Sequence, residues 1–202
     1  PHLKKSVHPL QGESITVGTK AVTGRIAYGR MYALCILVNP DISLHVPDFR
    51  SSENLFQDIS SLSEHVKPEG TIIIQTRMPE HPVFRFIKKY RFHDFFREEL
   101  SLRRSLAYPP FSRMISITLS SKEDVGRTIM KSFRLSDEKV EIMGPFHRTT
   151  KGIHLWKVIL KSTAKERLHQ HARDILNHLK DDKRIKAVAD VEPISMEDIS
   201  SF

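Results

Sequence analysis

The sequence contains a single cysteine and no long apolar run, and both absences exclude classes of protein. Cys35 alone among 202 residues rules out an internal disulfide and any zinc site built from several cysteines. It lies in the apolar run MYALCILV, which favours a buried structural thiol over a reactive one. No stretch is long and apolar enough to cross a bilayer, and the first residues show no signal-peptide pattern, so we expect a cytoplasmic protein.

The signatures of ATP hydrolysis are also missing. The chain has no GxxxxGK[ST] loop to hold phosphates and no acidic box of the DExH kind to hold magnesium. No catalytic residue and no metal ligand is therefore assigned. The polypeptide by itself is expected not to hydrolyse ATP.

Positive charge is what the composition has in excess. Lysine and arginine number 32 against 24 acidic residues, a formal net charge of +8. With 39% hydrophobic and 28% charged residues, the chain has the composition of a folded protein, with length for one large or two small domains. The basic balance favours polyanionic partners without saying which.

A rigid corner divides the chain near its middle. A helical pattern with apolar Phe96, Leu100 and Leu106 runs into the sequence Tyr-Pro-Pro-Phe at 108–111, where two prolines forbid further helix. From residue 113 to 120, apolar and polar residues then alternate with the period of a half-buried strand. One domain therefore ends as a helix and a second begins as a strand.

The residues before the corner have the pattern of a parallel α/β sheet. Met31–Val38 is a continuous apolar strand of the kind buried on both faces. Ser51 or Ser52 is a candidate cap for the helix after it. The other expected elements are short strands at 15–19 and 71–76, a helix whose apolar face is Leu55, Phe56, Ile59 and Leu62, and a helical segment in two pieces from 83 to 106.

The residues after the corner follow the order β-α-β-β-α-β. This order predicts a split βαβ sandwich, a four-stranded antiparallel sheet with two helices on one face. Thr163 and Glu166 form a capping-box pattern at the start of the second helix. The expected strands are 113–120, 140–143, 154–161 and 185–191, and the helices lie around 125–133 and at 165–180.

A basic loop at 146–157 is the main candidate for binding chemistry in this second domain. His147, Arg148, Lys151 and Lys157 flank Trp156, a combination suited to phosphate contacts with base stacking. A tryptophan buried in the core is the alternative interpretation. A glycine-rich basic stretch, GTKAVTGRIAYGR at 18–30, is a weaker phosphate-binding candidate, because its spacing fits no dinucleotide or phosphate-loop signature.

Several of these stretches resemble one family. Glu98-Glu99, Arg103-Arg104 and the Tyr-Pro-Pro-Phe corner, NPDISLHVPDFRSSENLFQ at 39–57, and TIIIQT at 71–76 resemble sequences of the PriA family (primosomal protein N′), superfamily 2 helicases of replication restart. The resemblance runs from about residue 15 to 195. It implies the end of a second RecA-like helicase lobe at 1–82, linker helices and the corner at 83–112, and a C-terminal split βαβ domain at 113–202.

The resemblance also indicates where the chain departs from the family. Gly18, Thr19, Gly24, Asp48 and Arg50 match motifs that couple nucleotide to DNA, although the residues themselves favour a local ion pair between Asp48 and Arg50 over a catalytic pair. The family's GRAGR arginines, which reach the nucleotide, are replaced by SSLSEHVK at 60–67. The family's cofactors are ATP, magnesium and zinc, and none is expected in this chain.

The resemblance implies DNA as the main partner, forked or single-stranded, together with other primosome proteins. The acidic tail of single-stranded DNA-binding protein is implied as the partner of Lys165 and His169. The residues expected at DNA are Arg103, Arg104, Arg148, Lys151, Trp156 and Lys157. The predicted function is thus a non-catalytic DNA-binding part of a PriA-like protein, with two alternatives: a fragment of an active ATP-dependent 3′-5′ helicase, or a module that binds an acidic peptide.

Overall fold

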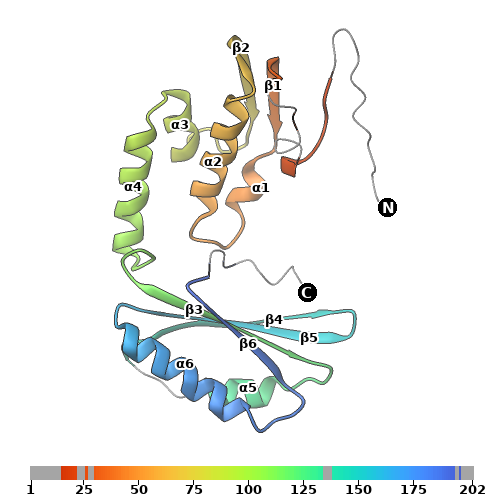
Figure 1. Ribbon diagram of the computed structural model, residues 1–202, viewed down its shortest axis with the longest axis vertical. Coiled ribbons are helices and arrows are strands. Elements are labelled where there is room, and N and C mark those ends of the chain that lie inside the picture. Colours follow the sequence, from red (N-terminus) through yellow and green to blue (C-terminus); the bar gives the residue numbers. More distant parts are fainter. Residues whose placement is uncertain (1–14, 22–25, 27–29, 134–137, 194–195, 197–202) are drawn as a thin grey trace.

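The computed structural model arranges the chain as two units joined by a short corner (Figure 1). It describes residues 15–21, 26, 30–133, 138–193 and 196. The N-terminal unit consists of β1 (Tyr32–Val38), α1 (Asp41–Leu44), α2 (Ser51–Ser63), β2 (Val66–Gln75), α3 (Pro82–Lys88) and α4 (Phe92–Ser105). The C-terminal unit consists of β3 (Arg113–Ser121), α5 (Gly126–Ser132), β4 (Glu141–Thr150), β5 (Ile153–Ser162), α6 (Lys165–Leu179) and β6 (Lys186–Val191).

Strands β1 and β2 pair in parallel, as the sequence predicts. Ile36 lies opposite Ile73 in the register. Strand β2 begins earlier than expected, at Val66, and a register shift accompanies its first residues. A Cβ atom at Gly70 would come within 2.9 Å of the Ala33 carbonyl oxygen, so a residue without a side chain is needed where the two backbones approach.

The prediction that β1 is buried on both faces is wrong. Leu34, Ile36 and Val38 are 48–65% exposed, because helices cover only the face that carries Leu37 and Ile74. Cys35 is half-buried, and burial raises the pKa of its thiol. The short strand expected at 15–19 does not form, since these residues pair with no neighbouring strand and Ile15 is 93% exposed.

Phenylalanine rings hold the N-terminal unit together. The rings of Phe56 on α2 and Phe95 on α4 stack with their centres 4.1 Å apart and their planes 1° apart. The helical segment predicted in two pieces is α3 and α4, and both pack on α2 as part of this core. Phe96, expected on the apolar stripe, stays 43% exposed. The buried residues of the core are Leu55, Phe56, Ile59, Val83, Phe84, Phe86 and Phe95.

Neither α2 nor α6 has the side-chain cap that the sequence suggests. Arg50 occupies the N-cap position of α2 without a side-chain hydrogen bond. The Ser51 hydroxyl instead donates to the carbonyl oxygens of Val46 and Asp48, each at 2.8 Å, and so fixes the loop before the helix. At α6 the N-cap is Ala164, whose N–H donates to Ser162 Oγ at 3.0 Å, so the predicted capping box does not form.

Both α3 and α4 end in the same backbone motif with an unusual residue. After α3, the N–H of Arg91 donates to the Phe86 carbonyl and the N–H of Tyr90 to the Ile87 carbonyl, both at 3.0 Å. This is a Schellman motif, whose left-handed position is usually glycine. Here Tyr90 occupies it at φ 52°, and Ala107 occupies the equivalent position after α4 at φ 49°. A side chain in this conformation costs roughly 1–2 kcal/mol.

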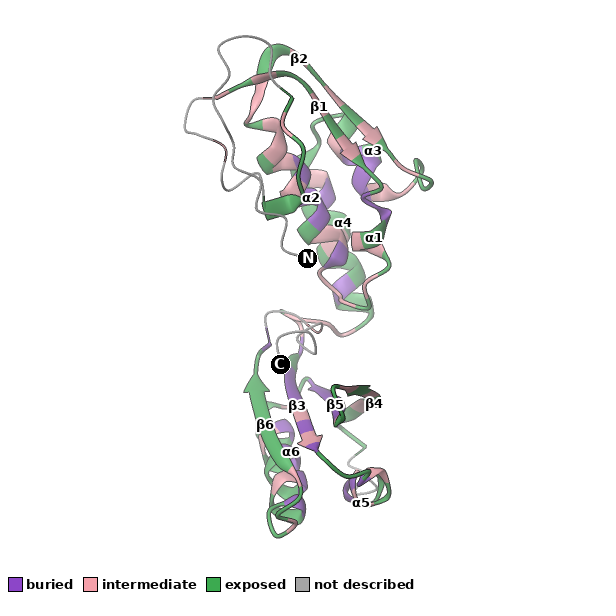
Figure 2. Ribbon diagram, turned by 90° about the vertical axis from the view of Figure 1, so that its right-hand side faces the viewer, coloured by how far each residue is buried: buried purple, intermediate pink, exposed green. Residues whose placement is uncertain are grey.

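The C-terminal unit is the predicted split βαβ arrangement. The strand order is β4-β5-β3-β6, and the three neighbouring pairs are antiparallel. Helices α5 and α6 cover one face (Figure 1), and the purple segments of Figure 2 mark buried residues on β3, β5 and α6. The core of this unit is Ile115, Ile117, Leu119, Val125, Ile129, Val140, Trp156, Val158, Leu160, Leu168, Ala172, Ile175 and Leu179.

Strand β4 continues beyond Gly144-Pro145, where the sequence led us to expect its end. A register shift between Met143 and Phe146 absorbs the irregularity, and the strand runs on to Thr150. The expected loop at 146–157 is therefore a β-hairpin. Its turn is Lys151-Gly152, with φ values of 50° and 77°, the left-handed pair that a tight two-residue hairpin turn requires.

Aromatic and backbone contacts connect the two units. The rings of Phe49, before α2, and Tyr108, in the corner, stack 5.3 Å apart. Lys161 of β5 lies over the Tyr108 ring, its Nζ 4.6 Å from the centre, and donates to the Leu106 carbonyl at 3.0 Å. The backbone N–H of Met196 donates to Asp48 Oδ2 at 2.8 Å. The face of the sheet without helices thus lies against the N-terminal unit (Figure 1).

His81 gives the N-terminal unit an expected dependence on pH. Its Nδ1 accepts the N–H of Val83 at the start of α3, and burial lowers the pKa of its ring, opposed by the Asp41 carboxylate. In the unfolded chain His81 binds a proton below about pH 6.5, whereas in the folded chain it does so only at lower pH. The stability that neutral His81 contributes is therefore complete above about pH 6.5 and declines as the pH falls below it. Urea unfolding at pH 7.5 and 5.5 should show a smaller acid-induced loss for His81→Asn, which keeps a capping acceptor. An equal loss in both proteins would contradict this account.

None of the helices in the described part of the chain is long and apolar enough to span a membrane.

Candidate nucleic-acid interface

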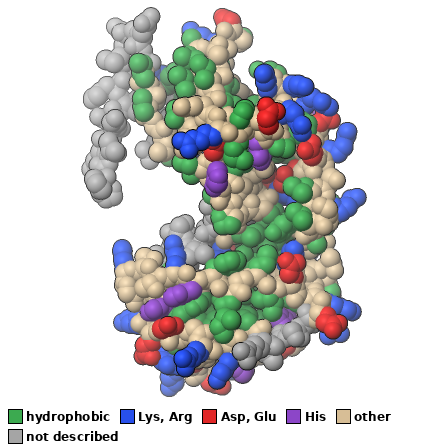
Figure 3. Space-filling view, turned by 180° about the vertical axis from the view of Figure 1, so that it is seen from behind, with side chains coloured by type: hydrophobic (Ala, Val, Ile, Leu, Met, Phe, Trp, Pro, Cys, Tyr) green, Lys and Arg blue, Asp and Glu red, His purple; other side chains and the backbone are tan. Residues whose placement is uncertain are grey.

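The end of the β4–β5 hairpin carries three of the side chains that the sequence singled out, together with His154. We call His147, Arg148, Lys151 and His154 the hairpin surface. Lys151 and His147 are exposed, whereas Arg148 and His154 are half-buried. Blue and purple side chains gather at the left-hand end of the lower unit in Figure 3, where the turn between these strands lies. The geometry places four polar side chains with ring or cationic groups at one projecting edge.

The two histidines of the hairpin surface stack on Trp156. Strand pairing sets His147 opposite Trp156, with ring centres 4.8 Å apart and planes 19° apart. The His154 ring lies 5.6 Å from Trp156 and 5.3 Å from His147. His147 Nε2 and His154 Nδ1 are 3.1 Å apart, a hydrogen bond that requires one nitrogen to donate and the other to accept.

Trp156 lies in the core rather than on the surface. Its side chain is 4% exposed and belongs to the cluster between the sheet and the helices. Of its two interpretations, the structure places it in the core, and the ring has no free face for a nucleic-acid base. The aromatic rings that remain accessible on this hairpin are those of Phe146 and His147, which are exposed, and His154, which is half-buried.

Lys157 does not reach the surface that the DNA prediction requires. It is 2% exposed, on the face of the sheet that lies against the N-terminal unit, and its Nζ donates to the Met196 carbonyl. Its neighbour on the same face, Lys161, is also buried and pairs with Glu141 at 2.9 Å. Both ammonium groups therefore bind partners within the protein.

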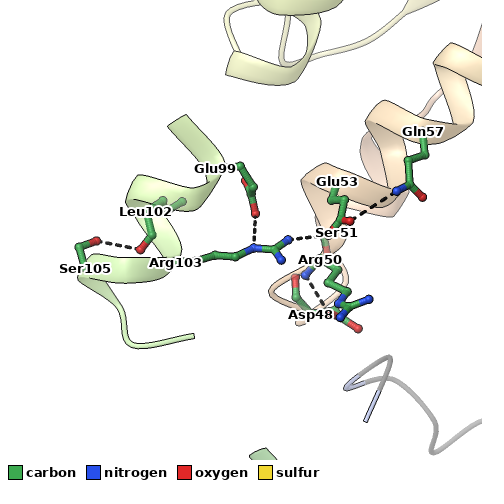
Figure 4. A network of polar contacts seen from close by, with 9 residues as sticks. All are labelled: Asp48, Arg50, Ser51, Glu53, Gln57, Glu99, Leu102, Arg103 and Ser105. Carbon is green, nitrogen blue, oxygen red and sulfur yellow. Dashed lines mark hydrogen bonds and ion pairs between the residues drawn. The ribbon is translucent and has the colours of Figure 1, made fainter. Parts of the chain in front are cut away.

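Arg103 is likewise an internal residue. It is 8% exposed, and its guanidinium donates to Glu53 at 2.7 Å and to Glu99 at 3.0 Å, joining α4 to α2 (Figure 4). It also lies 5.0 Å from the centre of the Phe49 ring. This position corrects the prediction of a DNA-facing Arg103, because the side chain is almost fully buried and is paired with two carboxylates of the protein.

Arg104 stays at the surface but apart from the hairpin surface. Its guanidinium lies over the Phe111 ring, 4.6 Å from the centre. The corner adjoins the first residue of β3, which pairs with Ser162, whereas the far end of β3 at Ser121 pairs with His154. The two predicted groups of DNA-binding cations therefore lie at opposite ends of the sheet.

Asp48 and Arg50 belong to the junction between the units. Asp48 Oδ1 accepts a hydrogen bond from the backbone N–H of Arg50 at 2.8 Å (Figure 4). The Arg50 guanidinium lies 5.3 Å from the centre of the Phe49 ring. The local ion pair that was one interpretation does not form. Gly18 and Thr19 lead to Lys20, which pairs with Asp58 on α2 at 2.6 Å, and Gly24 lies outside the described residues.

Lys165 and His169 lie one helical turn apart at the start of α6. Because they are four residues apart, both lie on one side of the helix. Lys165 is exposed and His169 is half-buried. Their assignment to an acidic partner tail remains a prediction. Among the described residues, no group of three or more histidine, cysteine, aspartate or glutamate side chains is arranged to hold a metal ion.

Sequence reasoning missed His154 as a member of the hairpin surface. The signal for it was the dipeptide Lys151-Gly152, because a two-residue turn there sets Thr149 opposite His154 and His147 opposite Trp156. The expected strand at 140–143 ended too early to pair with the expected strand at 154–161, and this hid the pairing.

Comparison with known proteins identifies the C-terminal unit. Residues 104–194 match the family described as the primosomal protein N C-terminal domain. These limits enclose β3 to β6 and the hairpin surface.

Curated relatives extend the similarity into the N-terminal unit. The replication restart protein PriA of Borreliella burgdorferi is 28% identical over 194 residues, covering 90% of this chain and 29% of that protein. The PriA of Bacillus subtilis is 26% identical, covering 90% of this chain and 24% of that protein. The PriA of Synechocystis is 30% identical, covering 75% of this chain and 20% of that protein. The chain thus spans between a fifth and a third of the length of these relatives.

Among solved structures, the de novo designed protein Foldit4 aligns with 41% of this chain at a TM-score of 0.37 and 18% identity, too weak a similarity to support an argument.

Proposed function

Because this chain is a C-terminal region of the PriA type, we propose that it binds DNA during replication restart and does not itself turn over ATP. The observation that carries the proposal is the hairpin surface. The exposed Lys151 forms the tip of the hairpin, the half-buried Arg148 and the exposed His147 lie on opposite faces of β4 behind it, and all three are within the residues that match the primosomal protein family. Cations in such positions bind phosphates through charge and counterion release.

The hairpin surface suits an edge or end of DNA better than a groove. A tight turn with lysine at its tip presents a point of charge, and imidazole rings with hydrogen-bonding edges lie behind it. Phosphate contacts of this kind position a protein on DNA without reading its sequence. We therefore propose forked or single-stranded DNA, bound without sequence preference, as the ligand.

The remaining assignments extend this proposal. We propose that the N-terminal unit is the end of a second RecA-like lobe, supported by the parallel β1–β2 pair and by the relatives that cover it. Lys165 and His169 are proposed as contacts for the acidic tail of single-stranded DNA-binding protein, and other primosome proteins as further partners. The proposed location is the cytoplasm, where the DNA of a bacterium is replicated.

Fluorescence anisotropy with forked, single-stranded and duplex DNA across a salt series, together with an ATPase assay, tests the proposal. Preference for a fork or single strand, a steep decrease in affinity with salt and no ATP turnover would support it. ATP turnover would favour the active helicase instead. Competition by an acidic peptide without any DNA binding would favour the protein-interaction module.

Removing the cations of the hairpin surface should weaken DNA binding. The double variant Arg148→Gln and Lys151→Gln is expected to bind forked DNA about 10-fold more weakly, and the slope of log affinity against log salt should fall by roughly 1.4–1.8. The charge-matched control replaces Lys180 and Lys183, exposed after α6, with glutamine and should retain most of the affinity. Equal losses in both double variants would show that net charge alone governs binding.

A further inference from the structure

The loop between α3 and α4 presents an aromatic ring to solvent between basic residues. Tyr90 is 77% exposed and has Lys89 before it and Arg91 after it. The Phe92 ring, 38% exposed, lies 6.4 Å from the Tyr90 ring. Tyr90 occupies the left-handed position of the Schellman motif, where glycine is the residue that fits without strain. The mostly exposed ring therefore buries little surface to offset the cost of this backbone conformation, which favours a binding role for it.

An open groove beside this loop is lined by four cations and two carboxylates among its eight residues. Its volume is about 640 Å³. Asp94 Oδ2 accepts a hydrogen bond from Arg91 Nε at 2.6 Å, and Asp94 Oδ1 lies 3.6 Å from Arg97 Nη1. These two contacts orient both guanidinium groups. The lining residues are Arg85, Phe86, Lys89, Arg91, Asp94, Arg97, Glu98 and Ser101.

The donors in the groove exceed the acceptors. Arg85 lies 3.7 Å from Glu98, so each arginine approaches a carboxylate through a single nitrogen. A guanidinium carries five N–H donors, and most of them remain directed to solvent. The groove therefore has the charge and the hydrogen-bonding capacity for phosphate groups.

We propose that the α3–α4 loop and groove form a binding site for single-stranded nucleic acid, separate from the hairpin surface. An unpaired base stacks on the Tyr90 ring, and the phosphates that flank it enter the groove. This combination of an exposed ring and a cationic track is how proteins bind single strands without sequence preference. A duplex would supply phosphates but no free base face, which distinguishes the two ligands.

The variant Tyr90→Gly tests the site without harming the fold. Binding of an oligothymidylate of about 15 nucleotides, followed by anisotropy, is expected to weaken about 10-fold, while affinity for a duplex of equal length changes less than 2-fold. Tyr90→Phe keeps the ring and should retain the affinity. The melting temperature of Tyr90→Gly should equal or exceed that of the parent, since glycine suits the left-handed position. Unchanged single-strand affinity, or an equal loss on duplex, overturns the proposal.

A second pair of variants separates this site from the hairpin surface. Lys89→Gln with Arg97→Gln should reduce the salt dependence of oligothymidylate binding, whether or not Arg148 and Lys151 are intact. An oligothymidylate carrying 5-iodouracil should crosslink to the peptide that contains Tyr90. Crosslinks confined to the hairpin would overturn the α3–α4 site and leave the proposed function standing. Crosslinks confined to the peptide of Tyr90 would support the site and count against the hairpin surface.

Discussion

Replacing Arg103 with methionine is expected to lower the free energy of unfolding by about 3–5 kcal/mol. The guanidinium of Arg103 is enclosed by Glu53 on α2, Glu99 on its own helix and the Phe49 ring. Methionine fills much of the same volume but leaves two half-buried carboxylates without their cation. Urea unfolding at neutral pH measures the difference.

A matched surface arginine provides the control for this prediction. Arg97 lies on the same helix with its side chain 80% exposed, and Arg97→Met should change the free energy of unfolding by less than about 0.5 kcal/mol. Adding Glu53→Gln and Glu99→Gln to Arg103→Met should recover part of the loss, because the unpaired charges are then gone. A loss below about 1 kcal/mol for Arg103→Met alone would contradict the internal role of this residue.

Truncating Trp156 to alanine is expected to cost the C-terminal unit about 3–5 kcal/mol. The ring is 4% exposed in the core and supports both histidines of the hairpin surface. Thermal unfolding followed by near-ultraviolet circular dichroism measures the loss. Trp156→Phe, which keeps an aromatic ring, should lose much less.

The same pair of variants decides between the core and base-stacking interpretations of Trp156. If the tryptophan is purely internal, Trp156→Phe keeps its affinity for forked DNA within about 2-fold. Weaker DNA binding by Trp156→Phe with unchanged stability would instead show that the ring contacts a base, since stacking on one ring contributes about 1–3 kcal/mol per base.

The elements that the sequence predicts well are those with strong local signals. Period-two alternation locates β3, the apolar stripe of α6 locates the longest helix, and two prolines fix the corner at 108–111. The order of these elements is sufficient to predict the split βαβ sheet. Parallel pairing of β1 with β2 follows in the same way from two continuous apolar runs.

The failures concern interactions that a local pattern does not determine. Nothing in the pair Arg103-Arg104 says which side chain faces inward, although Glu99 four residues before Arg103 was a usable sign. The other partner, Glu53, lies 50 residues away in the chain. Gly144-Pro145 predicted the end of a strand, yet β4 continues past it. Strand β5 pairs with β4 both before the irregularity, at Met143, and after it, at Phe146.

In the candidate site too, local features were predictable from the sequence and long-range contacts were not. Clustering of basic residues around Trp156 is visible in the sequence, whereas the burial of Trp156 and Lys157 depends on which face of β5 each occupies. The sequence did not predict that Tyr90 is exposed, because its exposure results from its place in a helix-terminating motif. Asp48 and Arg50 matched a motif, yet their contacts lie at the junction with the corner and Met196.

Hydrogen–deuterium exchange of the whole chain, with and without forked DNA, tests most directly whether the hairpin surface binds DNA. The account predicts slower exchange of the backbone N–H groups at the end of the hairpin, from His147 to His154, when DNA is added at low salt, and loss of that protection in the Arg148→Gln and Lys151→Gln double variant. Saturating DNA that leaves exchange in this segment unchanged would contradict the account.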